Sequence, residues 1–121
     1  MTKIDLFRND RTVVTFQPGE TIFSAGDRGE VMYYIKEGEV DIIVDEDLVF
    51  TESEGDIFGE MALLDHSPRS ATAVAKTACT LVPVDERRFL FLVQQTPFFS
   101  IQVMRIMAER LRRENRRQSR R

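Results

Sequence analysis

The sequence predicts a mainly β fold with flanking helices: an antiparallel β jelly-roll barrel followed by C-terminal helices. Between residues 12 and 84, short segments rich in β-branched and aromatic residues alternate with turn signals every few residues to a dozen. That spacing is typical of antiparallel barrels and jelly rolls. After residue 84 the segments lengthen and their apolar residues take helical spacing, which indicates helices at the end of the chain.

The length of 121 residues suits a single domain spanning residues 1–121, and 42% hydrophobic residues can supply its core. We expect a β-roll over about 12–84, C-terminal helices over about 85–117 and a basic tail to residue 121. The expected strands lie between turn signals such as Pro18-Gly19 and Glu37-Gly38. In order, these strands are 12–16, 21–23, 31–36, 40–44, 48–51, 72–75 and 79–84.

Three acids at positions 45–47 interrupt the strand pattern. They are interpreted as a solvated hairpin tip rather than a metal site, because no histidine or further acid cluster supports them. A short helix is expected over 3–8. Near the C-terminus, Asp85 has the character of an N-cap before the apolar run 88–93. Thr96-Pro97 interrupts that helix, and a last helix is expected from about Phe98 towards Arg116.

The stretch from Ile57 to Thr72 carries the chemistry of the chain. Gly59 has no Cβ and so permits close backbone approach. The amides of Gly59 to Ala62 would be unpaired at a helix start, where they can face an anion. Arg69 returns a planar cation suited to a phosphate, and Glu60 is an acceptor suited to a hydroxyl. Phosphate donors beside a hydroxyl acceptor indicate a nucleotide.

The run Phe58-Gly59-Glu60-Met61-Ala62-Leu63-Leu64, followed by Pro68-Arg69-Ser70-Ala71-Thr72, resembles the phosphate-binding cassette of cyclic nucleotide-binding domains. These domains occur in cAMP-dependent kinase regulatory subunits, cyclic-nucleotide-gated channels and the bacterial catabolite activator protein. The resemblance extends over about residues 12–115. It implies that Glu60 holds the ribose 2′-hydroxyl and that Arg69 pairs with the cyclic phosphate. Backbone amides near Gly59, Ala62 and Ser70 would complete the phosphate shell.

By this resemblance the chain is a regulatory module that binds a cyclic nucleotide monophosphate and signals through its C-terminal helices. We expect cAMP as the main ligand and no cofactor. Ser70 leaves a cGMP-specific sensor open, because a hydroxyl here can contact the 2-amino group of a syn guanine. A degenerate cassette that serves only as a protein-interaction module is a further alternative, which the presence of both Glu60 and Arg69 opposes. The ligand-binding residues implied are Phe58, Gly59, Glu60, Met61, Ala62, Arg69, Ser70 and Ala71.

Catalysis finds little support in the sequence. His66 is the single histidine, whereas a cupin metal site needs several. Ser67, Ser70 and Cys79 lack believable His-Asp partners for nucleophilic chemistry. No Gly-Lys-Ser/Thr loop is present for a triphosphate. No catalytic residues and no metal ligands are therefore assigned, and we do not expect an enzyme.

The net charge of −3 is unevenly spread. Residues 105–121 hold eight arginines and two acids, a net +6, so the rest of the chain carries −9. The acidic body would repel a phosphate at long range, and Arg69 with the helix amides must act at short distance. The basic tail is interpreted as a solvated helix end, with nucleic acid or acidic lipid as alternative partners.

Cys79 is the only cysteine, which fits a reducing cytoplasm. No run of 18 apolar residues and no N-terminal signal-peptide pattern is present, so we expect a cytoplasmic protein without a membrane span. The chain ends at Arg121, before the helix-turn-helix domain that catabolite-activator proteins carry after their long helix. No DNA-binding domain is therefore expected in this chain.

The last expected helix carries an apolar stripe with heptad spacing, which Asn115 continues at an a position. The stripe predicts a parallel homodimer through this helix, although the arginines of the tail would repel one another in such a pair. The alternative is a lid, in which the helix folds over the bound base and uses Ile101 and Met104. The stripe consists of Ile101, Met104, Ala108 and Leu111.

Overall fold

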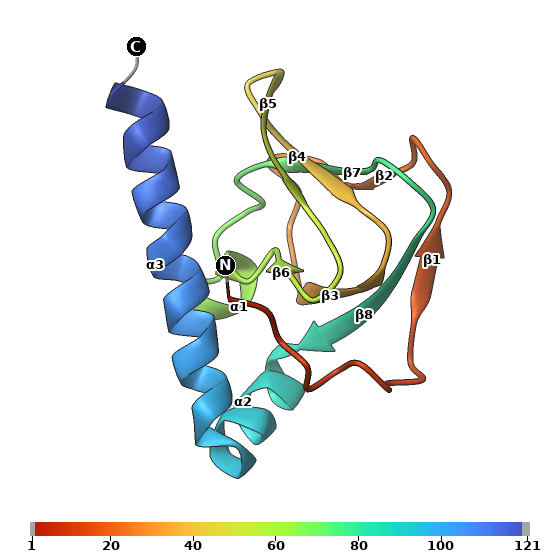
Figure 1. The fold of residues 1–121 in the computed structure, drawn as a ribbon, viewed down its shortest axis with the longest axis vertical. Helices are drawn as coiled ribbons and strands as arrows, with labels where there is room; N and C mark the ends of the chain where they lie inside the picture. Colours follow the sequence, from red (N-terminus) through yellow and green to blue (C-terminus); the bar gives the residue numbers. More distant parts are fainter. Residues whose placement is uncertain (1, 120–121) are drawn as a thin grey trace.

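The computed structural model describes residues 2–119, which form eight strands and three helices (Figure 1). The roll and its short inserted helix come first, and two longer helices follow. In chain order the elements are β1 (Val14–Phe16), β2 (Thr21–Phe23), β3 (Val31–Glu37), β4 (Val40–Val44), β5 (Asp47–Glu52), β6 (Ile57–Phe58), α1 (Met61–Leu64), β7 (Thr72–Ala75), β8 (Cys79–Asp85), α2 (Glu86–Gln95) and α3 (Pro97–Ser119).

The strands form two four-stranded antiparallel sheets. One sheet has the order β1-β8-β3-β6 and the other β2-β7-β4-β5, so most neighbours in space are distant in sequence. This is a jelly roll followed by helices, and the predicted fold class is confirmed. The hairpin tip is confirmed at Asp45 and Glu46, which take left-handed φ values of 51° and 69° between β4 and β5, whereas Asp47 is already the first residue of β5.

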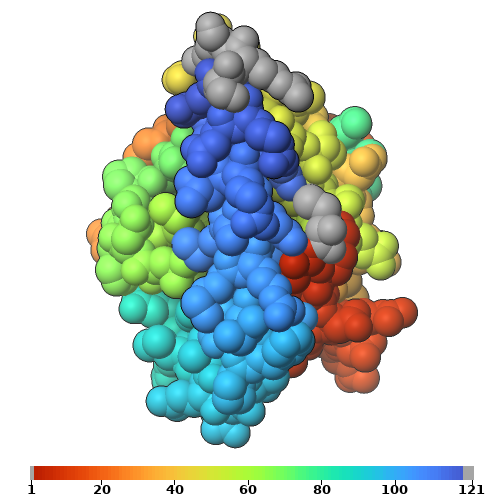
Figure 2. All heavy atoms as spheres, turned by 60° about the vertical axis from the view of Figure 1, so that its left-hand side comes forward, coloured from red at the N-terminus to blue at the C-terminus, as the bar shows by residue number. Residues whose placement is uncertain are grey.

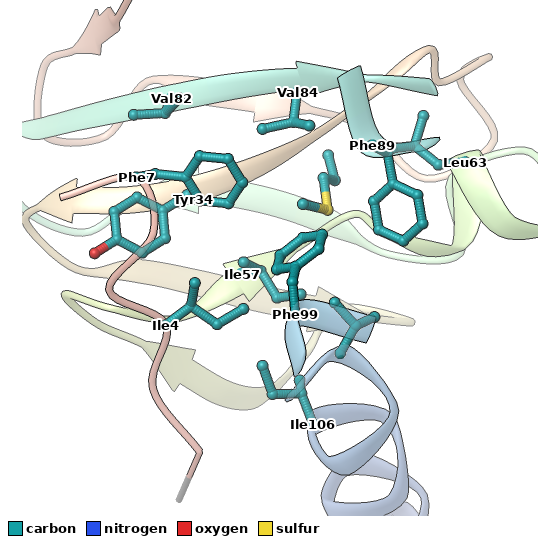
Figure 3. Close-up of a cluster of buried hydrophobic side chains, with 12 residues drawn as sticks. Ile4, Phe7, Tyr34, Ile57, Leu63, Val82, Val84, Phe89, Phe99 and Ile106 are labelled. Carbon is teal, nitrogen blue, oxygen red and sulfur yellow. The ribbon is translucent and has the colours of Figure 1, made fainter. Parts of the chain in front are cut away.

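Strand β3 is buried on both faces, because its side chains alternate between two separate cores. Met32 and Tyr34 face the cluster shared with the helices, whereas Ile35 faces the interior of the roll. Figure 3 shows the first cluster, in which Phe99 of α3 lies among side chains of the sheet and α2. Burial of each such apolar side chain contributes about 1.5–3 kcal/mol. The helices are therefore anchored to the roll at this face.

The junction of α2 and α3 follows the predicted punctuation. The Asp85 carboxylate accepts a hydrogen bond from the Arg88 backbone N–H at 2.8 Å, as an N-cap does. Helix α2 ends when Thr96 leaves the helical conformation, and Pro97 occupies the first position of α3. The predicted N-cap and the predicted interruption are both confirmed.

One local prediction is wrong, and one strand was not predicted. The expected helix over 3–8 is absent among the described residues. Turn hydrogen bonds hold the segment instead, and they direct Ile4 and Phe7 into the core. Strand β6 was not predicted, because two residues between Gly55 and Gly59 are too short to show alternation.

Helix α3 runs along one side of the roll, passing α1 and the end of β5 (Figure 1). In Figure 2 it covers the front of the molecule, with the N-terminal segment lying beside it. The backbone N–H and hydroxyl of Thr2 donate to the Glu109 carboxylate at 3.1 and 2.8 Å, which ties that segment to the helix. No helix in residues 2–119 is long and apolar enough to cross a membrane.

Candidate functional site

The turn after β6 brings several amides to one place. Gly59 has φ +77°, a left-handed conformation that L side chains rarely adopt. The Glu60 carbonyl then accepts the N–H groups of Leu63 and Leu64 at 3.0 and 3.2 Å. The amides of Met61 and Ala62 precede these first helical bonds, so they belong to the donors that a helix start leaves without intrahelical partners. The predicted helical run is thus observed over α1, with Glu60 just before it.

Arg69 is held from both its backbone and its side chain. Its N–H donates to the Asp27 carbonyl at 2.8 Å, and its own carbonyl accepts the Gly26 N–H at 2.7 Å. Its guanidinium donates to the Gly59 and Val31 carbonyls at 3.0 and 2.7 Å. The two chain segments predicted to carry the site therefore meet, and the guanidinium lies against the Gly59 turn.

The charge of Arg69 is buried without an ion pair. The residue is 8% exposed, and its guanidinium lies 4.0 Å from the centre of the Phe23 ring. Within residues 2–119, no carboxylate forms a salt bridge with it. Burial lowers the pKa of Arg69, although Tyr33, Asp27 and Glu60 act in the opposite direction. A buried arginine costs free energy unless an anion compensates it, so this side chain is suited to bind one.

Gly29 makes room for that guanidinium. A β-carbon placed at Gly29 would lie 2.5 Å from Arg69 Nε and 2.8 Å from the Ala62 Cβ. Both distances are shorter than real β-carbon contacts allow, so only glycine fits beside the arginine in this position.

Glu60 is 4% exposed, and its carboxylate forms an ion pair with Arg110 of α3. Arg110 also donates to the Ile57 carbonyl and lies 3.7 Å from the Glu52 carboxylate. Burial opposes the charge of Arg110, but Glu60 and Glu52 outweigh it and raise its pKa. One arginine of the helix thus joins the cassette turn to the roll.

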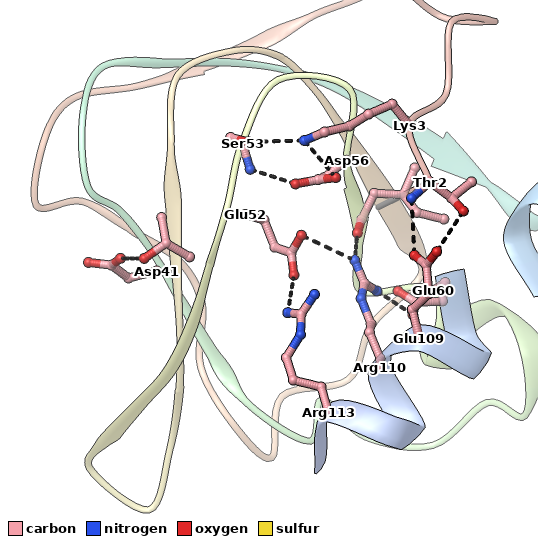
Figure 4. A network of polar contacts seen from close by, with 12 residues as sticks. Thr2, Lys3, Asp41, Glu52, Ser53, Asp56, Glu60, Glu109, Arg110 and Arg113 are labelled. Atoms are coloured by element: carbon pink, nitrogen blue, oxygen red, sulfur yellow. Dashed lines mark hydrogen bonds and ion pairs between the residues drawn. The ribbon is translucent and has the colours of Figure 1, made fainter. Parts of the chain in front are cut away.

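The pair of Glu60 and Arg110 belongs to a cluster of six charged residues (Figure 4). Three acids come from the end of β5, the loop after it and the cassette, and three cations come from α3 and the N-terminal segment. Glu52 is 1% exposed; burial raises its pKa to about 7, an effect that Arg110 opposes and Asp56 reinforces. The acids are Glu52, Asp56 and Glu60, and the cations are Lys3, Arg110 and Arg113.

A cavity of about 600 Å³ lies between the roll and α3. The cassette and the loop after it form one wall, apolar residues of β4 and β5 form another, and α3 covers it. Arg69 and Glu60 are both in this lining, so a buried cation and a buried acceptor face one space. Apolar side chains in the lining include Phe23, Ile42, Val44, Val49, Phe50 and Leu111.

All eight residues predicted for the ligand site line this cavity. They come from β6, the turn, α1 and the segment before β7, which the fold brings to the same cavity. The residues are Phe58, Gly59, Glu60, Met61, Ala62, Arg69, Ser70 and Ala71.

The part of α3 that covers the cavity differs from the part expected for a lid. Met107, Ala108 and Leu111 line the cavity, whereas Ile101 and Met104 do not. Met104 is 55% exposed and Ile101 is also exposed, because both lie on the helix face opposite Phe99. The alternative in which Ile101 and Met104 form a lid is therefore not what the structure shows, because neither residue lines the cavity.

The sequence interpretation missed Arg110, Arg113 and Glu52. A signal was present in α3: Phe99, Val103, Ile106, Arg110 and Arg113 recur at spacings of 4, 3, 4 and 3. The first three are buried against the roll, and the arginines continue the same face. The acids that they meet could not be identified from this spacing, because their positions depend on the fold.

Another cleft, of about 840 Å³, lies near the start of α2. Its lining mixes Arg28 and His66 with Glu30 and Glu86; an ion pair joins Arg28 to Glu30 at 3.7 Å, and a ring nitrogen of His66 lies 3.7 Å from the Glu86 carboxylate. These side chains are largely exposed, so the cleft lacks the buried charge of the first cavity.

A family model described as cyclic nucleotide-binding domain matches residues 13–96. The chain is 38% identical over 80 residues to a cGMP-dependent protein kinase of Plasmodium berghei, covering 64% of this chain and 9% of the kinase. It is 42% identical over 71 residues to a cAMP-dependent protein kinase regulatory subunit of Eremothecium gossypii, covering 59% of this chain and 16% of that subunit. The chain thus spans only a small part of these two relatives.

The structure is similar to that of the catabolite activator protein of Thermus thermophilus, with a TM-score of 0.82 and 28% identity. The similarity covers 95% of this chain and 56% of the other. It therefore includes α3 as well as the roll that the family model matches.

Proposed function

The chain belongs to the cyclic nucleotide-binding domain family, and from this premise we propose that it binds a cyclic nucleotide monophosphate in the cavity between the roll and α3. The observation that carries the proposal is the buried Arg69, which lines the cavity without a carboxylate partner among residues 2–119. A phosphate would supply the missing negative charge, and a guanidinium binds phosphate through paired N–H donors.

The remaining roles follow from the position of each group. The Met61 and Ala62 amides would donate to phosphate oxygens beside Arg69. Glu60 would accept the ribose 2′-hydroxyl, since a carboxylate can accept several hydrogen bonds and keep its pair with Arg110. The apolar walls from β4 and β5 would hold the base.

We propose cAMP as the main ligand, with Ser70 as the residue that bears on the choice of base. Ser70 follows Arg69 directly and lines the cavity, where its hydroxyl could meet a syn guanine. Of the two relatives named above, the Plasmodium berghei kinase is named for cGMP and the Eremothecium gossypii regulatory subunit for cAMP. Their names therefore favour neither nucleotide.

We propose a regulatory rather than a catalytic role. Ligand binding would be transmitted through α3, because the helix covers the cavity and its Arg110 pairs with Glu60. A ligand can shift such a helix only if it makes different contacts with the two positions of the helix.

A parallel homodimer through α3 also remains our proposal. Ile101 and Met104 are exposed large apolar residues on the face of α3 opposite Phe99, which supports their use for a contact outside the roll, whereas Ala108 and Leu111 of the stripe line the cavity. The buried face of α3 is already occupied by the roll, so a second chain would meet the opposite face.

Isothermal titration with cAMP and cGMP tests the binding proposal, with Arg69→Ala as the decisive variant. Loss of the guanidinium should weaken nucleotide binding by about 2–5 kcal/mol, because a charged pair loses one partner. Arg69→Lys keeps the charge and loses the planar guanidinium, so its nucleotide affinity should lie between those of the parent and of Arg69→Ala. Arg28→Ala is the matched control, because Arg28 is an exposed arginine nearby that does not line this cavity.

Circular dichroism must show that the Arg69 variants fold, since the change leaves the Gly59 and Val31 carbonyls without this donor. A folded Arg69→Ala protein that binds as tightly as the parent would contradict the proposed phosphate role. A parent protein that binds neither cAMP nor cGMP would contradict the proposed function.

A further inference from the structure

Helix α3 can cover the cavity only while the part of the helix that lines it, Met107 to Leu111, is held against the roll. Its lower part is fixed by Phe99, Val103 and Ile106, which are buried in the shared core (Figure 3). Beyond Ile106, Met107 still packs at the edge of the shared core, and the face that meets the roll then carries Arg110 and Arg113, which contact acids. The part of the helix that covers the cavity therefore depends on the acids that it meets.

Glu52 is the acid that both arginines share. Its carboxylate lies 3.7 Å from Arg110 and 3.4 Å from Arg113, and Figure 4 shows both side chains pointing from α3 to the end of β5. The Arg113 guanidinium also lies 4.6 Å from the centre of the Phe50 ring, and Phe50 lines the cavity. The same arginine thus contacts the buried acid and the wall of the site.

Glu52 differs from Glu60 in one respect that decides its role. Glu60 lines the cavity and is the acceptor proposed for the ligand, whereas Glu52 lies outside the lining. A ligand can compete for Glu60 but has no access to the pair between Glu52 and Arg113. This pair can hold the helix with or without a bound nucleotide.

We propose that Glu52 is a positioning residue, which through Arg113 and Arg110 holds α3 over the cavity and so controls how fast a bound nucleotide leaves. The effect on the ligand rests on the proposed function, whereas the effect on the helix does not. Removal of the carboxylate should loosen the covering part of α3 and leave the β3–β8 pairing unchanged.

Hydrogen–deuterium exchange of the full chain without nucleotide tests the effect on the helix. At pH 8 Glu52→Gln and Arg113→Gln should each speed exchange in residues 107–117 at least about fivefold, because Arg110 and Arg113 oppose the cost of burying the Glu52 charge and a helix opens locally when such contacts are lost. Peptides of β3 and β8 should exchange as in the parent. Asp41→Asn is the matched control, because Asp41 of β4 is a carboxylate that accepts its hydrogen bond within the sheet, from Thr51 of β5.

Dissociation of radiolabelled cAMP into excess unlabelled cAMP tests the effect on the ligand. Each of the two variants should release cAMP at least about fivefold faster than the parent, and the double variant should release it no faster than the faster single variant. Multiplying effects in the double variant would show that the residues act separately and would overturn the proposal.

Unchanged exchange in α3 of a folded Glu52→Gln protein would also overturn the proposal. If Glu52→Gln does not fold, Arg113→Gln decides, since Arg113 is partly exposed and its removal disturbs the core less. If the parent binds neither cAMP nor cGMP, the proposed function fails, and the exchange experiment still decides whether Glu52 holds the helix.

Discussion

The Arg110 guanidinium and the Glu60 carboxylate, 50 positions apart in the chain, form an ion pair between α3 and the cassette turn. Both groups are largely buried, and Glu60 also lines the cavity. The position of the helix and the state of the proposed site are therefore linked through one contact.

Replacement of Arg110 by methionine should lower the free energy of unfolding by about 3–5 kcal/mol, because it leaves the buried carboxylates of Glu60 and Glu52 without this partner. Urea denaturation monitored by circular dichroism measures the loss. Glu60→Gln in the same protein should recover part of it, since one uncompensated charge is removed. Arg112→Met, an exposed change on the same helix, is the control, and a loss below about 1 kcal/mol in Arg110→Met would contradict the expected burial cost.

The raised pKa of Glu52 predicts a stability that falls as the pH rises. The pKa is about 7 in the folded protein against 4.5 for the ordinary side chain, mainly because of burial. The contribution of Glu52 is therefore complete below pH 4.5 and is lost as the pH rises through 7. It should lower the free energy of unfolding by about 3 kcal/mol across that window.

Urea denaturation at several pH values between 4.5 and 8 checks this, with Glu52→Gln as the comparison. The difference between parent and variant isolates Glu52, because other titrating groups act in both proteins. Asp10 is one of these: burial alone would raise its pKa, but hydrogen bonds from Arg88 and Thr12 lower it overall. Parallel pH profiles for parent and variant would contradict the predicted titration of Glu52.

For the base, cAMP should bind more tightly than cGMP in competition experiments. Ser70→Ala should leave cAMP affinity nearly unchanged and weaken cGMP, because only a syn guanine offers its 2-amino group to this hydroxyl. A parent protein that binds cGMP at least about tenfold more tightly, a difference of about 1.4 kcal/mol, would reverse the assignment.

For assembly, light scattering at micromolar concentration should show a dimer that Met104→Glu disrupts. Met104 is the better position for this test, because Leu111 lines the cavity and a charge there would also disturb ligand binding. Arg112→Glu serves as a control for added negative charge on an exposed position of α3. A monomer in both the presence and the absence of cAMP would end the dimer proposal.

Local signals allowed most of the fold to be predicted from the sequence. Turn residues such as Pro18-Gly19 delimit the strands, and Asp85 with Pro97 delimits the helices, so each boundary has a cause within a few residues. The N-terminal segment was mistaken for a helix because its apolar residues have suitable spacing. The positions of Ile4 and Phe7 are instead set by tertiary packing, because both are buried in the cluster formed by the roll and α3.

The two halves of the candidate site were also predictable, because Gly59, Glu60 and Arg69 lie within one short stretch of the chain. The charged residues around this site, Arg110 and Glu52, could not be predicted from the sequence. Arg110 and Glu52 acquire their partners only when α3 docks on the roll, and a periodic stripe does not specify which acids it will meet. Burial of charge, which distinguishes Arg69 from the exposed Arg28, also exists only in the folded chain.

Gly29 is required by the side chains that pack against it and not by its own backbone conformation. Its φ lies outside the left-handed range, so the backbone there would accept other residues, and the conflict is with the Arg69 guanidinium and the Ala62 Cβ. In a library randomised at this position, sorting for folded protein would retain only variants in which the Arg69 guanidinium swings aside and the backbone at Ala62 shifts. Sorting for ligand capture would discard these variants too, so the two enrichment profiles would diverge at a residue that contributes no functional group.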